Sequence, residues 1–146
     1  MIMKKYILLI ISIILSVGIA CSDDIKTTDI NVLPGKAQKY LANFNSQISL
    51  IEIDEQIIGG DRFEVLLVDG TEIDFNAEGE WTGIDCKAIT VPSMFVPKSI
   101  SNYITQHFPN LGIKKIEKDS RGYDVELTNG IDLKFDQKGV FLRIDD

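Results

Sequence analysis

The stretch FDQKGVFLRIDD at residues 135–146 decides the fold, because FNAEGEWTGIDC at residues 75–86 has already given the same pattern. In both stretches a phenylalanine precedes a polar turn that ends in glycine, and an aromatic residue and then Ile-Asp follow. A strand, a turn with a left-handed glycine and a returning strand produce this pattern. The repetition therefore predicts a recurring hairpin, which is a structural element and not a site.

The similarity continues through most of the chain, as a duplicated supersecondary unit would require. Matching residues lie 60 positions apart in the strands and 63 apart in the helices, so the first copy carries three extra residues near Gly59-Gly60. The clearest pairs are Phe63 with Tyr123, Val65 with Val125, Gly70 with Gly130, Pro34 with Pro97, and Tyr40 with Tyr103.

Each copy has the pattern of one helix followed by antiparallel strands. A proline precedes an apolar stripe with helical spacing, formed by Ala37, Tyr40, Leu41 and Phe44 in the first copy and by Ile100, Tyr103, Ile104 and His107 in the second. Strands are predicted at residues 49–56, 62–68, 72–75 and 80–84, and again at 113–118, 122–127, 131–135 and 140–144. Asp69-Gly70 and Asn129-Gly130 predict two-residue turns. We therefore expect an α+β fold of two tandem repeats, each with one helix packed on a four-stranded antiparallel sheet, and whether the two sheets merge into one stays open.

The N-terminal residues have the features of an export signal. Lys4 and Lys5 precede an apolar run at residues 6–20 that is too short to span a bilayer and ends at Cys21. Gly18-Ile19-Ala20-Cys21 resembles a bacterial lipobox, in which the cysteine is acylated. We expect a lipoprotein signal peptide at 1–20, lipid at Cys21, a flexible tether at 21–32, repeat 1 at 33–89, a linker at 90–96 and repeat 2 at 97–146. The alternative is ordinary cleavage that leaves a soluble secreted protein.

The charge and the cysteines limit the classes of partner. The formal net charge is −7, and it becomes more negative when Lys4 and Lys5 are removed, so nucleic acid is not an expected partner. With Cys21 carrying lipid, Cys86 has no cysteine left to pair with. The expected location is the bacterial envelope, most simply the outer membrane, on either its periplasmic or its outer side.

The sequence offers little catalytic chemistry. The single histidine, His107, occupies a helix position that Phe44 takes in the other copy, so we expect it to be a half-buried packing residue. No triad pattern, nucleophile elbow or phosphate-binding glycine loop accompanies it. We therefore expect no enzyme, no catalytic residue and no cofactor, and a hydrolase centred on His107 is the weaker alternative.

A second alternative is calcium binding. Asp74, Asn76, Glu78 and Asp85, with Gly79 between them, have the spacing of an EF-hand loop. That loop should join two helices, whereas this stretch is predicted to be a β-hairpin, and the second copy has lysines at two of the positions. A divalent-cation-binding envelope protein stays open as the alternative function, and no metal ligand is assigned.

The repeated pattern also resembles a known family. Tyr103 in a proline-led helix, Tyr123-Asp124-Val125, Asn129-Gly130, Phe135 and Gly139 make the chain similar to the beta-lactamase-inhibitor-like, PepSY-like family of exported proteins, over residues 33–146. The resemblance implies a sheet that docks on another envelope or extracellular protein. No binding residue transfers, because the matched positions are structural.

The sheet face directed away from the helices is the candidate binding surface. In the second copy its residues alternate as charged or polar side chains, as on a solvated face. In the first copy two aliphatic residues lie among carboxylates, at Glu64, Leu66, Val68, Glu72 and Asp74. We expect these five residues to bind a partner with a basic surface, which makes the protein a non-enzymatic binding or inhibitor-like module. The alternative is that Leu66 and Val68 are covered by the loop at Ile57-Ile58 or by the other copy.

Overall fold

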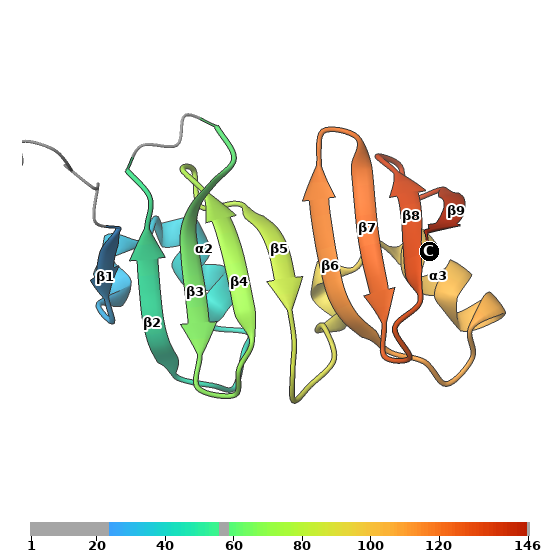
Figure 1. Cartoon of the computed structure of the whole chain (residues 1–146), viewed down its shortest axis with the longest axis horizontal. Coiled ribbons are helices and arrows are strands. Elements are labelled where there is room, and N and C mark those ends of the chain that lie inside the picture. The colour runs from blue at the N-terminus through green and yellow to red at the C-terminus, as the bar shows by residue number, and fades with distance from the viewer. Residues whose placement is uncertain (1–23, 56–58, 146) are drawn as a thin grey trace, which may run out of the picture.

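A computed structural model describes residues 24–55 and 59–145 of the chain. The strands form one antiparallel sheet in strict chain order, from β1 at one edge to β9 at the other (Figure 1). The strands are β1 Ile25–Thr27, β2 Ile48–Ile53, β3 Asp61–Leu67, β4 Glu72–Asn76, β5 Trp81–Asp85, β6 Ile113–Asp119, β7 Gly122–Leu127, β8 Asp132–Asp136 and β9 Phe141–Asp145. Two short α-helices, α2 Gly35–Leu41 and α3 Lys98–His107, lie behind the sheet in Figure 1, and two 3-10 turns, η1 Ile30–Val32 and η2 Ser93–Phe95, precede them in the chain.

The predicted fold class was wrong, because the two halves do not form separate four-stranded sheets. Strands β5 and β6 pair with each other, with Gly83 opposite Glu117, Ile84 opposite Ile116 and Asp85 opposite Lys115. This pairing satisfies backbone groups that two separate sheets would leave exposed at their edges. It also buries Ile84 and Ile116 almost completely. The chain is therefore a mostly β protein with a single nine-stranded sheet.

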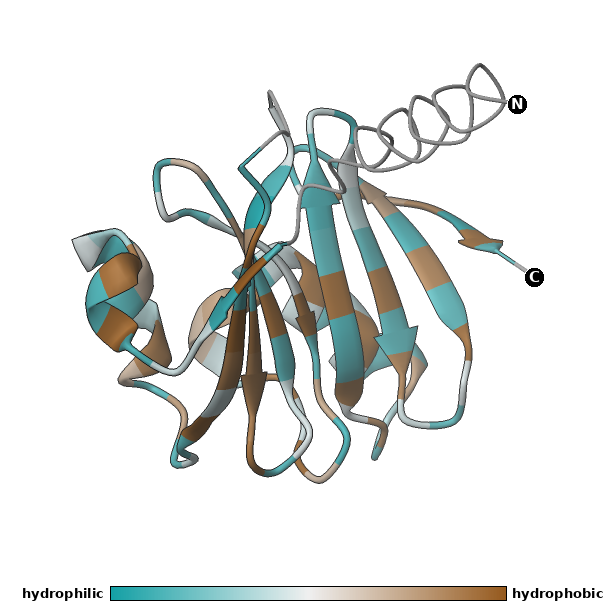
Figure 2. Cartoon of the chain, turned by 60° about the vertical axis from the view of Figure 1, so that its left-hand side comes forward, coloured by the Kyte–Doolittle hydropathy of each residue, from teal (hydrophilic) through white to brown (hydrophobic). Residues whose placement is uncertain are grey.

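The core lies between the sheet and the two helices. Hydrophobic and hydrophilic residues alternate along the strands, as a sheet covered on one face requires (Figure 2). The covered face contributes Phe75 and Phe135, both almost completely buried. Ala37 of α2 and Ile100 of α3 are fully buried above it. The opposite face of the sheet, which we call the outer face, carries no helix among the described residues.

The segment predicted to be a linker at residues 90–96 contributes to this core. Its residue Phe95, in η2, is 4% exposed and lies among three aromatic side chains. The ring centroid of Phe95 is 5.4 Å from that of Phe44, 5.8 Å from Tyr40 and 5.9 Å from Trp81. The connection between the halves is therefore packed against the first helix and the fifth strand.

The described part of the predicted flexible tether, residues 24–32, contains secondary structure. Residues Ile25–Thr27 form β1, which pairs with β2 and places Lys26 opposite Glu52. Asp29 then caps η1 by accepting the backbone N–H of Asn31. The predicted signal peptide and Cys21 lie outside the described residues. Among the residues that the structure describes, no helix is long and apolar enough to cross a membrane.

Candidate functional site

A row of facing residues crosses the middle of the outer face. Each residue in it is the cross-strand partner of the next, and the members are Glu52, Glu64, Asp74, Gly83, Glu117 and Asp124. We call the five acidic members the carboxylate row. Sequence analysis assigned Glu64 and Asp74 to the candidate surface but not Glu52, Glu117 or Asp124. Glu117 and Asp124 join the row only through the pairing of β5 with β6, and Glu52 joins it through the pairing of β2 with β3. The alternation of side chains along each strand would have identified them had one sheet been assumed.

The five residues predicted to bind a partner lie together on β3 and β4. Glu64 is directly opposite Asp74, and Leu66 is directly opposite Glu72. Leu66 is half-buried and also faces Leu50 of β2, so its aliphatic neighbour comes from the adjacent strand. Val68 follows the end of β3 and is 68% exposed. We call Glu64, Leu66, Val68, Glu72 and Asp74 the docking face.

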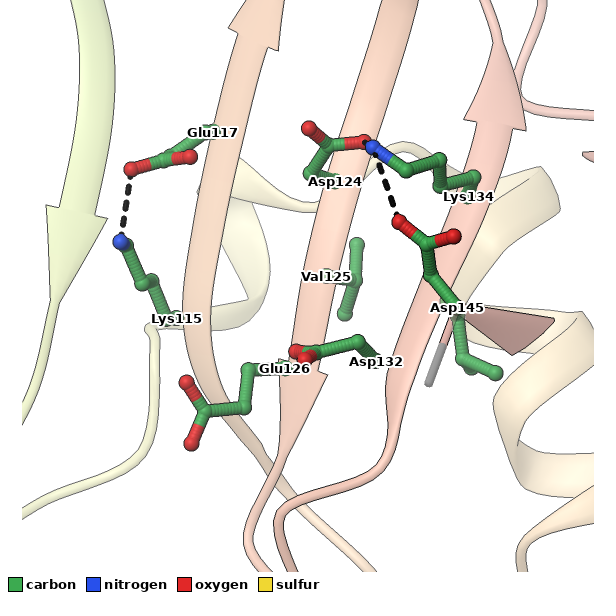
Figure 3. A pocket seen from close by; sticks show the side chains of 9 residues that line it. Lys115, Glu117, Asp124, Val125, Glu126, Asp132, Lys134 and Asp145 are labelled. Carbon is green, nitrogen blue, oxygen red and sulfur yellow. Dashed lines mark hydrogen bonds and ion pairs between the residues drawn. The ribbon is translucent and has the colours of Figure 1, made fainter. Parts of the chain in front are cut away.

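The two halves of the outer face differ in how their charges are compensated. In the second half Lys134 Nζ lies 2.9 Å from Asp124 and 3.4 Å from Asp145, and Lys115 Nζ lies 2.7 Å from Glu117 (Figure 3). These residues surround a shallow hollow of about 260 Å³. In the described part of the chain, no ion pair involves Glu64, Glu72 or Asp74. The docking face thus concentrates uncompensated negative charge, whereas the second half neutralises much of its own.

Asp74 is the most perturbed carboxyl group of the row. Its neighbour Gly83 has no side chain, and a Cβ atom there would lie only 2.9 Å from Asp74 Oδ2. The space belongs to a hollow of about 550 Å³ that Asp61, Asp74, Glu117 and Asp124 help to line. Burial, followed by the charges of Asp61, Glu64 and Glu117, raises the pKa of Asp74 to about 7. Burial and the charges of Glu52 and Glu72 also raise the pKa of Glu64.

Replacing Asp74 with asparagine is expected to stabilise the protein at neutral and higher pH. The folded-state pKa of about 7 lies above the ordinary value of 3.8, so ionisation of Asp74 opposes folding. Stability is therefore lost as the pH rises from about 4 to 7, and the neutral asparagine would remove this loss. We expect a gain of about 1–2 kcal/mol at pH 8, a figure reduced because the group is partly open to solvent.

Thermal unfolding of the wild type and of Asp74→Asn between pH 4 and pH 8 measures this effect. Asp124→Asn is the matched control on the same row, because it removes the ion pair with Lys134 and is not expected to gain stability. The interpretation of Asp74 would be wrong if Asp74→Asn melted no higher than the wild type at pH 8.

The structure does not bring the four EF-hand positions together. The Oδ1 atom of Asn76 accepts the backbone N–H groups of Glu78 and Glu80, at 3.1 and 3.0 Å, and so closes the turn after β4. Asp85 faces Glu72, not Asp74, and its Oδ2 atom lies 2.7 Å from Lys87 Nζ. Within residues 24–55 and 59–145, no group of three or more His, Cys, Asp or Glu side chains is arranged to hold a metal ion.

His107 and Cys86, the other chemically distinctive residues, also have structural surroundings. His107 is exposed, not half-buried as predicted, and its ring stacks on Tyr103 with centroids 4.1 Å apart. Its Nδ1 atom lies 2.9 Å from the carbonyl oxygen of Tyr103. Cys86 is a fully buried free thiol, and burial raises its pKa, which disfavours the reactive thiolate.

A family model described as "Putative beta-lactamase-inhibitor-like, PepSY-like" matches residues 61–143, which is more than half of the chain. The chain belongs to this family. The resemblance inferred from sequence is thereby confirmed, although the match begins at β3 and not at residue 33. No curated protein matches this PepSY-like chain.

Three solved structures resemble the PepSY-like chain over most of its length. A "putative periplasmic protein of unknown function" from Bacteroides vulgatus is 36% identical, with a TM-score of 0.78, and the match covers 85% of this chain and 100% of that one. A second B. vulgatus periplasmic protein is 28% identical, with a TM-score of 0.78 and coverage of 87% and 100%. A "putative calcium-regulated periplasmic protein" from Bacteroides thetaiotaomicron is 29% identical, with a TM-score of 0.79 and the same coverage. These relatives support a place in the cell envelope for this PepSY-like chain.

Proposed function

We propose that this chain is a non-enzymatic envelope protein that binds a basic surface of another protein through its docking face. The observation that carries the proposal is the contrast between the two halves of the outer face. Glu64, Glu72 and Asp74 lack ion-pair partners among the described residues. At the equivalent positions 60 residues later, Asp124 and Lys134 form an ion pair with each other, and Lys134 also lies near Asp145. A surface kept acidic in this way attracts a basic partner and speeds its approach.

The aliphatic residues of the docking face supply apolar surface that a partner can bury. Val68 is largely exposed, and Leu66 and Leu50 lie side by side between the carboxylates and the edge of the sheet. A partner that covers these side chains would gain affinity by removing apolar surface from water, and the surrounding carboxylates would orient it. The inhibitor-like role implied by the family resemblance is consistent with a sheet face that docks in this manner.

Replacing Val68 and Glu72 with lysine is expected to abolish partner capture while leaving the fold intact. Val68 is 68% exposed, Glu72 is half-buried, and neither residue belongs to the core. The matched control is Thr128→Lys with Asp132→Lys, at the equivalent positions 60 residues later. Crosslinking in cells, followed by mass spectrometry, compares the partners captured by the wild type, by the docking-face variant and by the control variant. A partner that is captured equally by all three would contradict the docking face.

Calcium binding is the second candidate, and the observation that favours it is the description of one relative as calcium-regulated. The uncompensated carboxylates of the docking face would be the place where a cation accumulates. Calorimetric titration with calcium chloride separates the two functions, because binding to the native state alone would also raise the melting temperature. Heat and a raised melting temperature favour calcium, and their absence contradicts calcium binding.

We further propose that lipid at Cys21 holds the domain on the outer membrane. Only Ser22, Asp23 and Asp24 separate Cys21 from the start of β1, so an acylated cysteine would keep the first edge of the sheet close to the bilayer. The docking face extends from β3 to β4 and would remain accessible to proteins in the same compartment. This arrangement is compatible with either side of the membrane.

A further inference from the structure

Strand β9 leaves one edge of the sheet open and apolar. Among the strands that the structure describes, β9 pairs only with β8, and no strand lies beyond it in Figure 1. Leu142 is 54% exposed and Ile144 is 51% exposed. An edge strand of this kind presents unpaired backbone groups next to hydrophobic side chains, which is a template for another strand.

Elsewhere in the same chain, a strand similar to β9 is covered by a neighbouring strand. Strand β5 is the counterpart of β9, displaced by 60 residues, and both strands end in Ile-Asp. The pairing of each strand with the one before it shifts register at the same point, beside Phe75 in β4 and beside Phe135 in β8. On its other side β5 is covered by β6, whereas β9 has no such neighbour among the described strands.

The effect of that neighbour is visible in the exposure of two equivalent side chains. Ile84 in β5 faces Ile116 of β6 and is 1% exposed, whereas Ile144 in β9 is 51% exposed. On the outer face, Asp85 of β5 is opposite Lys115 of β6. The consecutive residues Lys115-Ile116 therefore match the Ile-Asp pair of the facing strand in both charge and hydrophobicity.

We propose that the open edge of β9 receives an extended, antiparallel segment of another protein in which a lysine or arginine immediately precedes an aliphatic residue. The basic residue lies opposite Asp145 on the outer face, and the aliphatic residue covers Ile144 on the helix side. Main-chain hydrogen bonds supply much of the affinity of such an added strand, and the alternating side chains supply its selectivity. The proposal goes beyond the docking face, since β9 lies at the other end of the sheet from β3.

A second copy of this chain is the less suitable occupant. The Lys115-Ile116 pair of that copy is already paired on both sides within its own sheet. The open edge of its β1 has Lys26 followed by threonine, which would leave Ile144 opposite a polar residue. The net charge of −7 also makes two copies repel each other.

A peptide with the sequence of residues 111–120, LGIKKIEKDS, is the appropriate probe, because it contains the segment that covers β5. Fluorescence anisotropy of the labelled peptide is measured against the folded chain without residues 1–20. We expect saturable binding, and we expect a peptide with Lys115→Glu to bind about tenfold more weakly, because it places a carboxylate opposite Asp145. The Asp145→Lys protein should bind the original peptide more weakly than the wild type does, and it should bind the Lys115→Glu peptide more tightly.

Two further proteins make the outcomes decisive. The Val68→Lys, Glu72→Lys protein should bind the peptide as tightly as the wild type does. The proposal for β9 can therefore fail while the docking face stands, and the docking face can fail while the proposal for β9 stands. If Asp145→Lys does not fold, Asp145→Asn replaces it and should weaken the original peptide less. The proposal is overturned by the absence of saturable binding, by equal binding of the two peptides, or by sedimentation showing that a second copy already occupies β9.

Discussion

Replacing Phe95 with alanine is expected to lower the free energy of unfolding by about 3–5 kcal/mol, as for other fully buried aromatic residues. The ring centroid of Phe95 lies between 5.4 and 5.9 Å from those of Tyr40, Phe44 and Trp81. Its removal would leave a cavity where η2, α2 and β5 meet, and the aromatic pair interactions would be lost with the buried area. Phe95 lies between the two halves and outside their repeated residues, so the repeat supplies no second aromatic residue that could fill the cavity.

Urea unfolding followed by tryptophan fluorescence measures this loss, because Trp81 makes an edge-on contact with the Phe95 ring. Met94→Ala is the matched control, since Met94 is the preceding residue and is 58% exposed. We expect Met94→Ala to change stability by about 0.5 kcal/mol or less. Similar losses for the two variants would show that η2 is a surface connection and not part of the core.

Replacing Gly122 with alanine is expected to destabilise the protein by about 3–5 kcal/mol. Gly122 opens β7 after a tight turn and has φ +147°, a conformation that only glycine adopts readily. A Cβ atom at this position would lie 2.1 Å from the carbonyl oxygen of Phe135 and 2.8 Å from the carbonyl carbon of Asp136. These are backbone atoms of the adjacent strand, so the sheet itself would have to deform.

Gly130→Ala separates the steric clash from the conformational cost. Gly130 also has a positive φ, +88°, but a Cβ atom there would have no heavy atom within 4 Å. We expect Gly130→Ala to cost about 1–2 kcal/mol, the penalty for a left-handed alanine alone. Thermal unfolding of both variants gives the difference, and an equal loss in the two would mean that β7 and β8 separate easily at Gly122.

Local structure was predictable from the sequence because it depends on nearby residues. The turn glycines Gly70, Gly79, Gly130 and Gly139 all have positive φ, as the hairpin pattern requires. The eight predicted strands lie within a few residues of β2 to β9, and both helices follow the predicted prolines. In each case the spacing of apolar residues, a turn sequence or a leading proline specified the element without reference to the rest of the chain.

The joining of the halves was not predictable in the same way. Ile84 and Asp85 end β5 as Ile144 and Asp145 end β9. Of these two strands, only β5 is paired on both sides within the described part of the chain. An internal comparison of the halves treats these strands as equivalent, so it cannot show that β6 covers one of them. Strand β1 was missed because Ile25–Thr27 is too short to show alternation and is ordered through its pairing with β2.

In the candidate site, too, the residues within one hairpin were predictable and the contacts between the two halves were not. Glu64, Leu66, Val68, Glu72 and Asp74 could be placed on one face, because they alternate within a single hairpin. Glu117 and Asp124 could not be joined to them, because they belong to the other half and meet Asp74 across Gly83. The charge of Glu117, which belongs to the other half, likewise adds to burial and to the charges of Asp61 and Glu64 in raising the pKa of Asp74.

The strict chain order of the nine strands has a consequence for how the molecule acquires its structure. Most strands pair with a strand joined to them by a short turn, so closing those loops costs little entropy, and among the described elements only the β1–β2 and β5–β6 pairs have a helix in their connection. The sheet can therefore form one hairpin at a time from either half. Formation of the short β5–β6 ladder, where Lys118 Nζ lies 3.9 Å from the centre of the Trp81 ring, then joins the two halves into one cooperatively folding sheet.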